Sequence, residues 1–194
     1  MSKKYYRFYG GLITAQERWL NRMAAKGLRL ISTGKMLYEF EECSPGQFQY
    51  RVEFIGQKSK KDAAEYRNFL EDMGYRVFFK NINLNYSAGK VVYCPWAEKG
   101  GRISTTSTTY NRELLIVEKE DDGKPLELHT TLEDKQNYYK TMRRPMLFGF
   151  LFWGTFAVIM KVWWVGILSA IFLIPLISCQ LELARIAKQA KLTE

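Results

Sequence analysis

The sequence predicts an α+β domain followed by a C-terminal transmembrane helical hairpin. Three observations lead to this fold class: apolar and polar residues alternate at 47–55, helical periodicity occurs at 14–26 and 59–73, and residues 145–181 contain a single charge, Lys161. The chain has 194 residues, of which 47% are hydrophobic and 25% charged. This composition excludes a largely disordered protein.

Histidine and cysteine are scarce, which limits the chemistry. The only histidine is His129, so metal sites built on two or three histidines are excluded, and a Ser-His or Cys-His catalytic pair would have to use His129. Cys43, Cys94 and Cys179 form no CxxC motif and cannot all pair, as is typical of a reducing compartment. We therefore expect no cofactor and no metal ion, and the absence of a catalytic motif favours a non-enzymatic protein.

Residues 1–96 predict the α+β domain. Thr14 and Glu17 form a capping box at the start of a helix that stops at Gly27. Four residues make its apolar face: Trp19, Leu20, Met23 and Ala24. Strands are predicted on both sides of this helix, at Tyr5–Tyr9 and Leu28–Ser32.

The next two segments, Met36–Glu42 and Gln47–Ile55, flank the turn signal Ser44–Gly46 and predict a β-hairpin. The second segment alternates strictly, which indicates a strand with one solvated face. Its apolar face consists of Phe48, Tyr50, Val52 and Phe54, and its polar face of Gln49, Arg51 and Glu53.

A second helix starts at a Ser59 cap and ends at Gly74, and strands follow at Tyr75–Phe79 and Lys90–Trp96. The Asn-rich segment Asn83–Gly89 is interpreted as a turn. The resulting order, β-α-β-β-β-α-β-β, predicts two helices on one face of an antiparallel sheet, a ferredoxin-like type of arrangement.

Residues 97–130 predict a linker, to which Glu113–Val117 can add one strand. The Ser/Thr-rich part, Ser104–Thr109, is read as flexible, with phosphorylation as the alternative. Residues 131–144 predict a juxtamembrane helix capped by Thr131, with acidic residues first and basic residues last, an order that suits the helix dipole.

Residues 145–181 predict a two-span hairpin. A helix from Met146 to Leu181 would be about 54 Å long, too long for one crossing of a membrane core of about 30 Å. Spans at Met146–Met160 and Val165–Leu181, joined by a turn at Lys161–Trp164, fit better. The alternative, a buried hairpin of a soluble protein, is disfavoured because Leu147–Met160 has no polar stripe at helical spacing.

The charge distribution predicts the orientation in the cell membrane. Basic residues precede the first span and follow the second, so both termini, including the basic tail 182–194, are expected in the cytoplasm. Met1–Gly11 lacks the apolar region of a signal peptide. Seven residues are expected at the membrane interface: Arg143, Arg144, Lys161, Trp163, Trp164, Arg185 and Lys188.

One family resemblance is present. It is carried by Trp19, Leu20, Met23, Ala24, Gly27, Leu30, Tyr38, Phe40, Cys43, Pro45, Gly46, Phe48 and Tyr50–Phe54, with Phe69 and Met73–Tyr75 further on. This pattern resembles the bacterial family DUF2812 over residues 5–96 and, more loosely, over 127–144. The resemblance implies C-terminal membrane spans and a gene located beside PadR-like regulators. The family has no assigned catalytic residues, so the resemblance points to no site in this chain.

Three groups of residues are candidates for chemistry, each beside a simpler interpretation. The polar face formed by Gln49, Arg51 and Glu53 is a candidate binding surface, although a solvated strand face is favoured. Cys43 is a candidate reactive thiol, although no histidine lies near it in the sequence. The carboxylates Glu39, Glu41, Glu42 and Glu118–Asp122 lack the spacing of a cation-binding loop.

The preferred hypothesis is a non-enzymatic, membrane-anchored cytoplasmic module with a regulatory or accessory role. Its expected partners are the lipid bilayer, another membrane protein or a second copy of itself, and a small-molecule ligand, whereas nucleic acid is disfavoured. One alternative is a sensor or transport accessory that binds hydrophobic small molecules. The other is a membrane-proximal enzyme that uses Glu39, Glu53 and Arg51.

Overall fold

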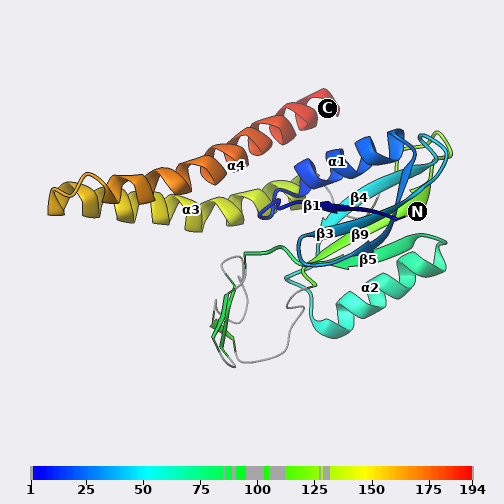
Figure 1. Cartoon of the computed structure of the whole chain (residues 1–194), viewed down its shortest axis with the longest axis horizontal. Helices are drawn as coiled ribbons and strands as arrows, with labels where there is room; N and C mark the ends of the chain where they lie inside the picture. The colour runs from blue at the N-terminus through cyan, green and yellow to red at the C-terminus, as the bar shows by residue number, and fades with distance from the viewer. Residues whose placement is uncertain are drawn as a thin grey trace. The chain divides into compact units, whose positions relative to one another are not determined.

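The computed structural model describes residues 2–84, 86–88, 91–94, 103–104, 112–126, 128 and 132–193. They belong to two compact units, the N-terminal unit Met1–Leu128 and the C-terminal unit His129–Glu194. The described residues contain four helices and antiparallel sheets, so the predicted α+β class is confirmed (Figure 1).

The strands lie in three-stranded antiparallel sheets of the N-terminal unit. They are β1 (Lys3–Tyr6), β2 (Leu28–Thr33), β3 (Leu37–Glu42), β4 (Phe48–Phe54), β5 (Arg76–Lys80), β6 (Tyr86–Ala88), β7 (Val91–Tyr93), β8 (Ile103–Ser104) and β9 (Leu114–Glu120). The first sheet has the order β1-β3-β2, the second β4-β9-β5, and the small third sheet β6-β7-β8. The single sheet predicted from the sequence is therefore wrong.

Two helices pack on these sheets, α1 (Ile13–Ala25) against β4 and β2, and α2 (Lys60–Asp72) against β5. The Ser59 side chain accepts a hydrogen bond from Asp62 N, so the predicted cap of α2 is confirmed. The predicted capping box of α1 is wrong, because the helix begins one residue before Thr14. The Glu17 carboxylate accepts hydrogen bonds from Arg51 and from Val52 N.

Strands β3 and β4 exist as predicted, but they do not form a hairpin, because they belong to different sheets. The C-terminal end of α1 holds the connection between them. Cys43 N donates to Gly27 O, and Gly46 N donates to Ala24 O, both at 2.9 Å. Gly27 has φ +76°, and a Cβ there would lie 2.7 Å from Cys43 O, so only glycine fits this crossing.

Strand β9 lies in the segment that the sequence assigns to the linker 97–130. It is the central strand of the second sheet, and the N-terminal unit extends to Leu128 instead of ending at residue 96. Residues Leu114–Val117 are at most 1% exposed, as expected for an apolar run at the centre of a sheet. The predicted strand Lys90–Trp96 corresponds to β7 in the small sheet. The predictions for Thr105–Thr109, His129 and Thr131 concern residues outside the part of the chain that the structure describes.

The C-terminal unit consists of two antiparallel helices, α3 (Leu132–Met160) and α4 (Val165–Thr193). The turn between them occupies 161–164, as predicted, whereas α3 runs without a break through Pro145. Small residues permit close packing: a Cβ on Gly149 would lie 2.6 Å from the Phe172 ring. Ser169 Oγ donates to Phe150 O at 2.9 Å across the pair.

One helix is long and apolar enough to cross a membrane. The candidate span is Val165–Lys188, with a mean hydropathy of 2.0 and 22% of its apolar window buried. Most of its apolar surface is thus exposed. The described part of α3 does not meet the same criterion.

Candidate functional site

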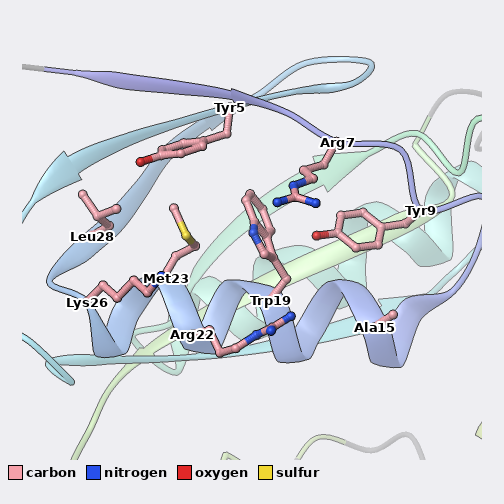
Figure 2. Close-up of a pocket in the computed structure, with 9 residues that line it drawn as sticks. All are labelled: Tyr5, Arg7, Tyr9, Ala15, Trp19, Arg22, Met23, Lys26 and Leu28. Carbon is pink, nitrogen blue, oxygen red and sulfur yellow. The ribbon is translucent and has the colours of Figure 1, made fainter.

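A groove with a volume of about 450 Å³ lies between α1, β1 with the segment that follows it, and the start of β2 (Figure 2). Helical spacing explains one wall, because Ala15, Trp19 and Arg22 repeat every three or four residues on α1 and Lys26, its C-terminal cap, continues the same spacing. The groove is lined by Tyr5, Arg7, Tyr9, Ala15, Trp19, Arg22, Met23, Lys26 and Leu28.

Trp19 is fixed at the centre of the groove. Its ring meets Tyr38 at a centroid distance of 4.9 Å and Phe40 at 5.5 Å, both edge-on. The Tyr5 and Tyr9 rings lie at 6.4 and 5.9 Å from it. Trp19 is 7% exposed. The packing therefore holds an apolar floor in one orientation, which favours binding without rearrangement.

Three cations surround this floor. Arg7 and Tyr9 project from the segment after β1 toward Trp19, whereas Arg22 and Lys26 come from α1 (Figure 2). Arg7, Arg22 and Lys26 are exposed, and no carboxylate is among the lining residues. Arg7 Cζ lies 5.9 Å from the Trp19 ring centroid. In the part of the chain that the structure describes, none of the three belongs to an ion pair.

The Tyr9 hydroxyl is influenced by two of these cations. Burial raises the pKa of Tyr9 to about 12, and the positive charges of Arg7 and Arg22 partly counteract this rise. Tyr9 therefore keeps its proton at neutral pH and presents a hydrogen-bond donor. Arg7 and Arg22, one from each wall of the groove, are thus the two cations that act on this hydroxyl.

An apolar floor with a cationic rim is suited to recognition of an anion that also has an apolar part. The volume falls at the small end of the range for ligand pockets, roughly 300–1,000 Å³. Guanidinium groups bind carboxylate and phosphate oxygens in a defined geometry, which favours arginine in such sites. The described lining residues include no carboxylate, cysteine, serine or histidine.

The structure places the predicted binding surface of β4 in contacts within the N-terminal unit. Gln49 donates to Lys124 O and accepts from Leu126 N. Arg51 forms an ion pair with Glu17 at 2.5 Å and donates to Leu126 O. The carboxylate of Glu53, a residue 3% exposed, accepts from Tyr66 at 2.6 Å. These three side chains attach α1, α2 and residues 121–126 to the sheet.

Sequence reasoning missed a buried polar cluster. Glu118, 2% exposed, accepts from the Tyr50 hydroxyl at 2.7 Å and pairs with Arg29 at 2.8 Å. The Tyr50 hydroxyl in turn accepts from Leu30 N at 2.8 Å. The cluster therefore joins the two sheets. No local pattern could predict it, because Arg29 and Glu118 are 89 residues apart in the sequence.

The other candidates also have partners or lowered reactivity. Glu39 pairs with Lys4 and Glu42 with Lys3 across the first sheet. Burial raises the pKa of the Cys43 thiol, which disfavours the reactive thiolate. The described residues contain no group of His, Cys, Asp and Glu side chains that could hold a metal ion.

The residues expected at the membrane interface form two groups, one at the turn between α3 and α4 and one further from it along both helices. Lys161, Trp163 and Trp164 are exposed at the turn, with Trp163 at 81%. In the second group, Arg143 donates to Gln180 at 2.7 Å and Arg185 to Glu182 at 2.5 Å. Arg144 and Lys188 are exposed.

The model of one family, described as "Protein of unknown function (DUF2812)", matches residues 13–151. This match covers more than half of the chain, so the chain belongs to the DUF2812 family. No curated protein and no solved structure matches the chain. The family assignment predicted from the residue pattern is thus confirmed.

Proposed function

We propose that this member of the DUF2812 family is a membrane-anchored, non-enzymatic binding module. Its N-terminal unit recognises an anionic ligand or partner in the basic aromatic groove, and its C-terminal unit anchors it in the membrane. The observation that carries this proposal is the groove itself, in which Arg7, Arg22 and Lys26 lie around the Trp19 floor and no carboxylate is among the described lining residues. Cations are normally paired or solvated, so three of them around one apolar groove favour an external anion.

We further propose that α3 and α4 cross the cell membrane as a hairpin with both termini in the cytoplasm. The apolar candidate span of α4 supports the first part of this proposal. The exposed stack of Phe148, Phe152 and Phe156 on α3, with ring centroids 6.0 and 6.4 Å apart, is suited to lipid or to another transmembrane helix. The turn with its two tryptophans is suited to an interface.

The groove also supports the second candidate, a sensor or transport accessory for hydrophobic compounds. Its floor of Trp19, Met23 and Leu28 is apolar, and each of these residues is at most 7% exposed. No observation favours an enzyme. Glu39 and Glu53, its proposed carboxylates, lie on β3 and β4 in different sheets.

The membrane part can be tested by cysteine labelling in intact cells. The three native cysteines are replaced by serine, and a single cysteine is introduced at Lys161 or at Lys188. A membrane-impermeant maleimide should label the Lys161→Cys variant and leave the Lys188→Cys variant unlabelled until the cells are opened. Equal labelling of both variants would contradict the two-span orientation.

The binding part can be tested by crosslinking in cells with the full chain, followed by mass spectrometry of the captured molecules. The Ala15→Phe variant fills the groove, and Arg18→Gln on the same helix is the control outside it. Loss of a captured partner or ligand with Ala15→Phe alone would support the groove as the binding site. An unchanged set of captured molecules would count against it.

A further inference from the structure

We propose that the ligand of the groove is an amphipathic organic anion, with one carboxylate or phosphate head and a compact apolar body. The head lies between Arg7 and Arg22, and the body lies over Trp19. This inference rests on the proposed function and adds the chemical class of the ligand and its orientation in the groove.

The position of the head follows from the positions of the charges. Arg7 comes from the segment after β1 and Arg22 from α1, so the two guanidinium groups belong to different walls of the groove. Tyr9, which is affected by both charges, supplies a neutral donor beside them. Two guanidinium groups and one hydroxyl match the several acceptor oxygens of a carboxylate or phosphate.

The nature of the body follows from the floor. Trp19, Met23 and Leu28 present carbon and sulfur atoms, and they are held by packing at 6–7% exposure. A ligand made of charge alone would make no use of the small exposed part of this floor or of the half-buried rings of Tyr5 and Tyr9. A neutral hydrophobic ligand would gain nothing from the cations and would reduce their contact with water. Only a ligand with both parts uses both features of the groove.

The same chemistry occurs in free organic acids and in anionic lipids. In both cases an oxyanion is attached to an apolar body, and the groove distinguishes this class from neutral compounds and from inorganic phosphate. Lys26, further along α1, supplies a second cationic position for a more highly charged head.

The inference can be tested with a matched pair of probes and the full chain in phosphatidylcholine nanodiscs. The probes are 1-naphthaleneacetate and its neutral amide, which share the apolar body, and binding is measured by calorimetry. The acid should bind at least about tenfold more tightly than the amide, because only the acid forms charge-assisted hydrogen bonds. Inorganic phosphate alone should bind more weakly than the acid.

Variants then locate the head. Arg7→Gln and Arg22→Gln should each weaken binding of the acid by about tenfold to a hundredfold and leave binding of the amide unchanged. Arg18→Gln removes the same charge from the same helix outside the groove and should have no effect. Equal binding of acid and amide, or equal effects of Arg18→Gln and Arg22→Gln, would overturn the inference.

Two further measurements show which of the two proposals has failed and whether the anion is a lipid or a free acid. If charge has no effect on binding but Ala15→Phe still removes the captured partner in cells, the anion class is wrong and the proposed function survives. If Ala15→Phe also has no effect, both are wrong. Where the anion class holds, nanodiscs with added phosphatidylglycerol identify the source: competition with the acid indicates a lipid, and unchanged binding indicates a free acid.

Discussion

The two sides of helix α1 carry polar residues with opposite surroundings. Toward β4, Glu17 accepts from Val52 N at 3.1 Å, and Asn21 both donates to and accepts from the backbone of Tyr50 at 2.8 and 2.9 Å. Toward the groove, Arg22 and Lys26 are exposed and belong to no ion pair among the described residues. The partners of a polar residue, and not its type, therefore distinguish a stabilising role from a binding role.

The largest effect on stability is expected in the buried polar cluster of Arg29, Tyr50 and Glu118. Glu118→Ala leaves the Tyr50 hydroxyl without its acceptor and Arg29 without its main partner, and it should lower the free energy of unfolding by about 3 kcal/mol. Amide hydrogen exchange of β4 and β9 in the full chain measures this loss. Glu118→Gln retains an acceptor for Tyr50 and should lose less. A loss below about 0.5 kcal/mol for Glu118→Ala would show that the buried polar contacts near β4 stabilise the fold no more than the exposed cations of the groove do.

Lys80 is a buried cation, in contrast to the exposed cations of the groove. Lys80 is 3% exposed, donates to Gly34 O and Lys35 O, and lies 4.6 Å from the Tyr38 ring centroid. Burial lowers the pKa of Lys80 from 10.5 to about 8. Between pH 8 and 10 the folded protein thus binds fewer protons than the unfolded protein, so its stability should rise with pH, by about 2–3 kcal/mol.

Amide exchange of β5 at pH 8, 9 and 10, corrected for the intrinsic rate, checks this rise. Lys80→Met should remove it, because the methionine side chain does not titrate. Above pH 10 the buried Tyr38 and Tyr50 should reverse the trend, because burial raises the pKa of each and the folded state keeps protons that the unfolded state loses. A Lys80→Met variant with an unchanged pH dependence would assign the rise to another group.

A smaller loss is expected at the edge of the second sheet. Asn21→Ala leaves the N–H and C=O groups of Tyr50 without the partners they have in the fold, and it should cost about 1–2 kcal/mol. Asn21→Asp keeps the acceptor for Tyr50 N and should cost less. Exchange of the Tyr50 amide reports on this contact directly, and unchanged protection in Asn21→Ala would show that the contact contributes little.

The smallest effect is expected in the groove. Arg22→Gln should change the free energy of unfolding by less than about 0.5 kcal/mol, because no ion pair of Arg22 occurs among the described residues. Thermal unfolding of this variant beside Arg18→Gln provides the measurement. A loss comparable to that of Asn21→Ala would give Arg22 a stabilising role and abolish the difference between the two sides of α1.

Local patterns in the sequence predicted local structure well. The Ser59 cap, the alternation in 48–54 and the turn at 161–164 depend on neighbouring residues, and the structure contains all three. Pairing between distant segments was not predictable. The sequence predicts a possible strand at Glu113–Val117, but nothing local indicates that β9 pairs with both β4 and β5 at the centre of the second sheet. The predicted β3–β4 hairpin is replaced by contacts of the connecting segment with the end of α1.

The candidate site was missed for the same reason. Tyr5, Arg7 and Tyr9 alternate in the sequence, and Trp19, Arg22 and Lys26 share a helical face, but nothing local indicates that these two groups meet. The polar face of β4 was instead singled out, because its alternation is regular. Its regularity reflects contacts with Tyr66, Glu17 and residues 121–126, which are visible only in three dimensions.

The contacts of α1 with β4 also bear on aggregation. β4 is an outer strand of its sheet, and the unpaired backbone of such a strand is a template for a strand from another molecule. Here Asn21 and Glu17 occupy Tyr50 N, Tyr50 O and Val52 N, so a foreign strand would first have to displace a helix. The proposed membrane anchoring would raise the local concentration of copies and so make this protection more important. The helix that presents the groove therefore also keeps the second sheet from joining another.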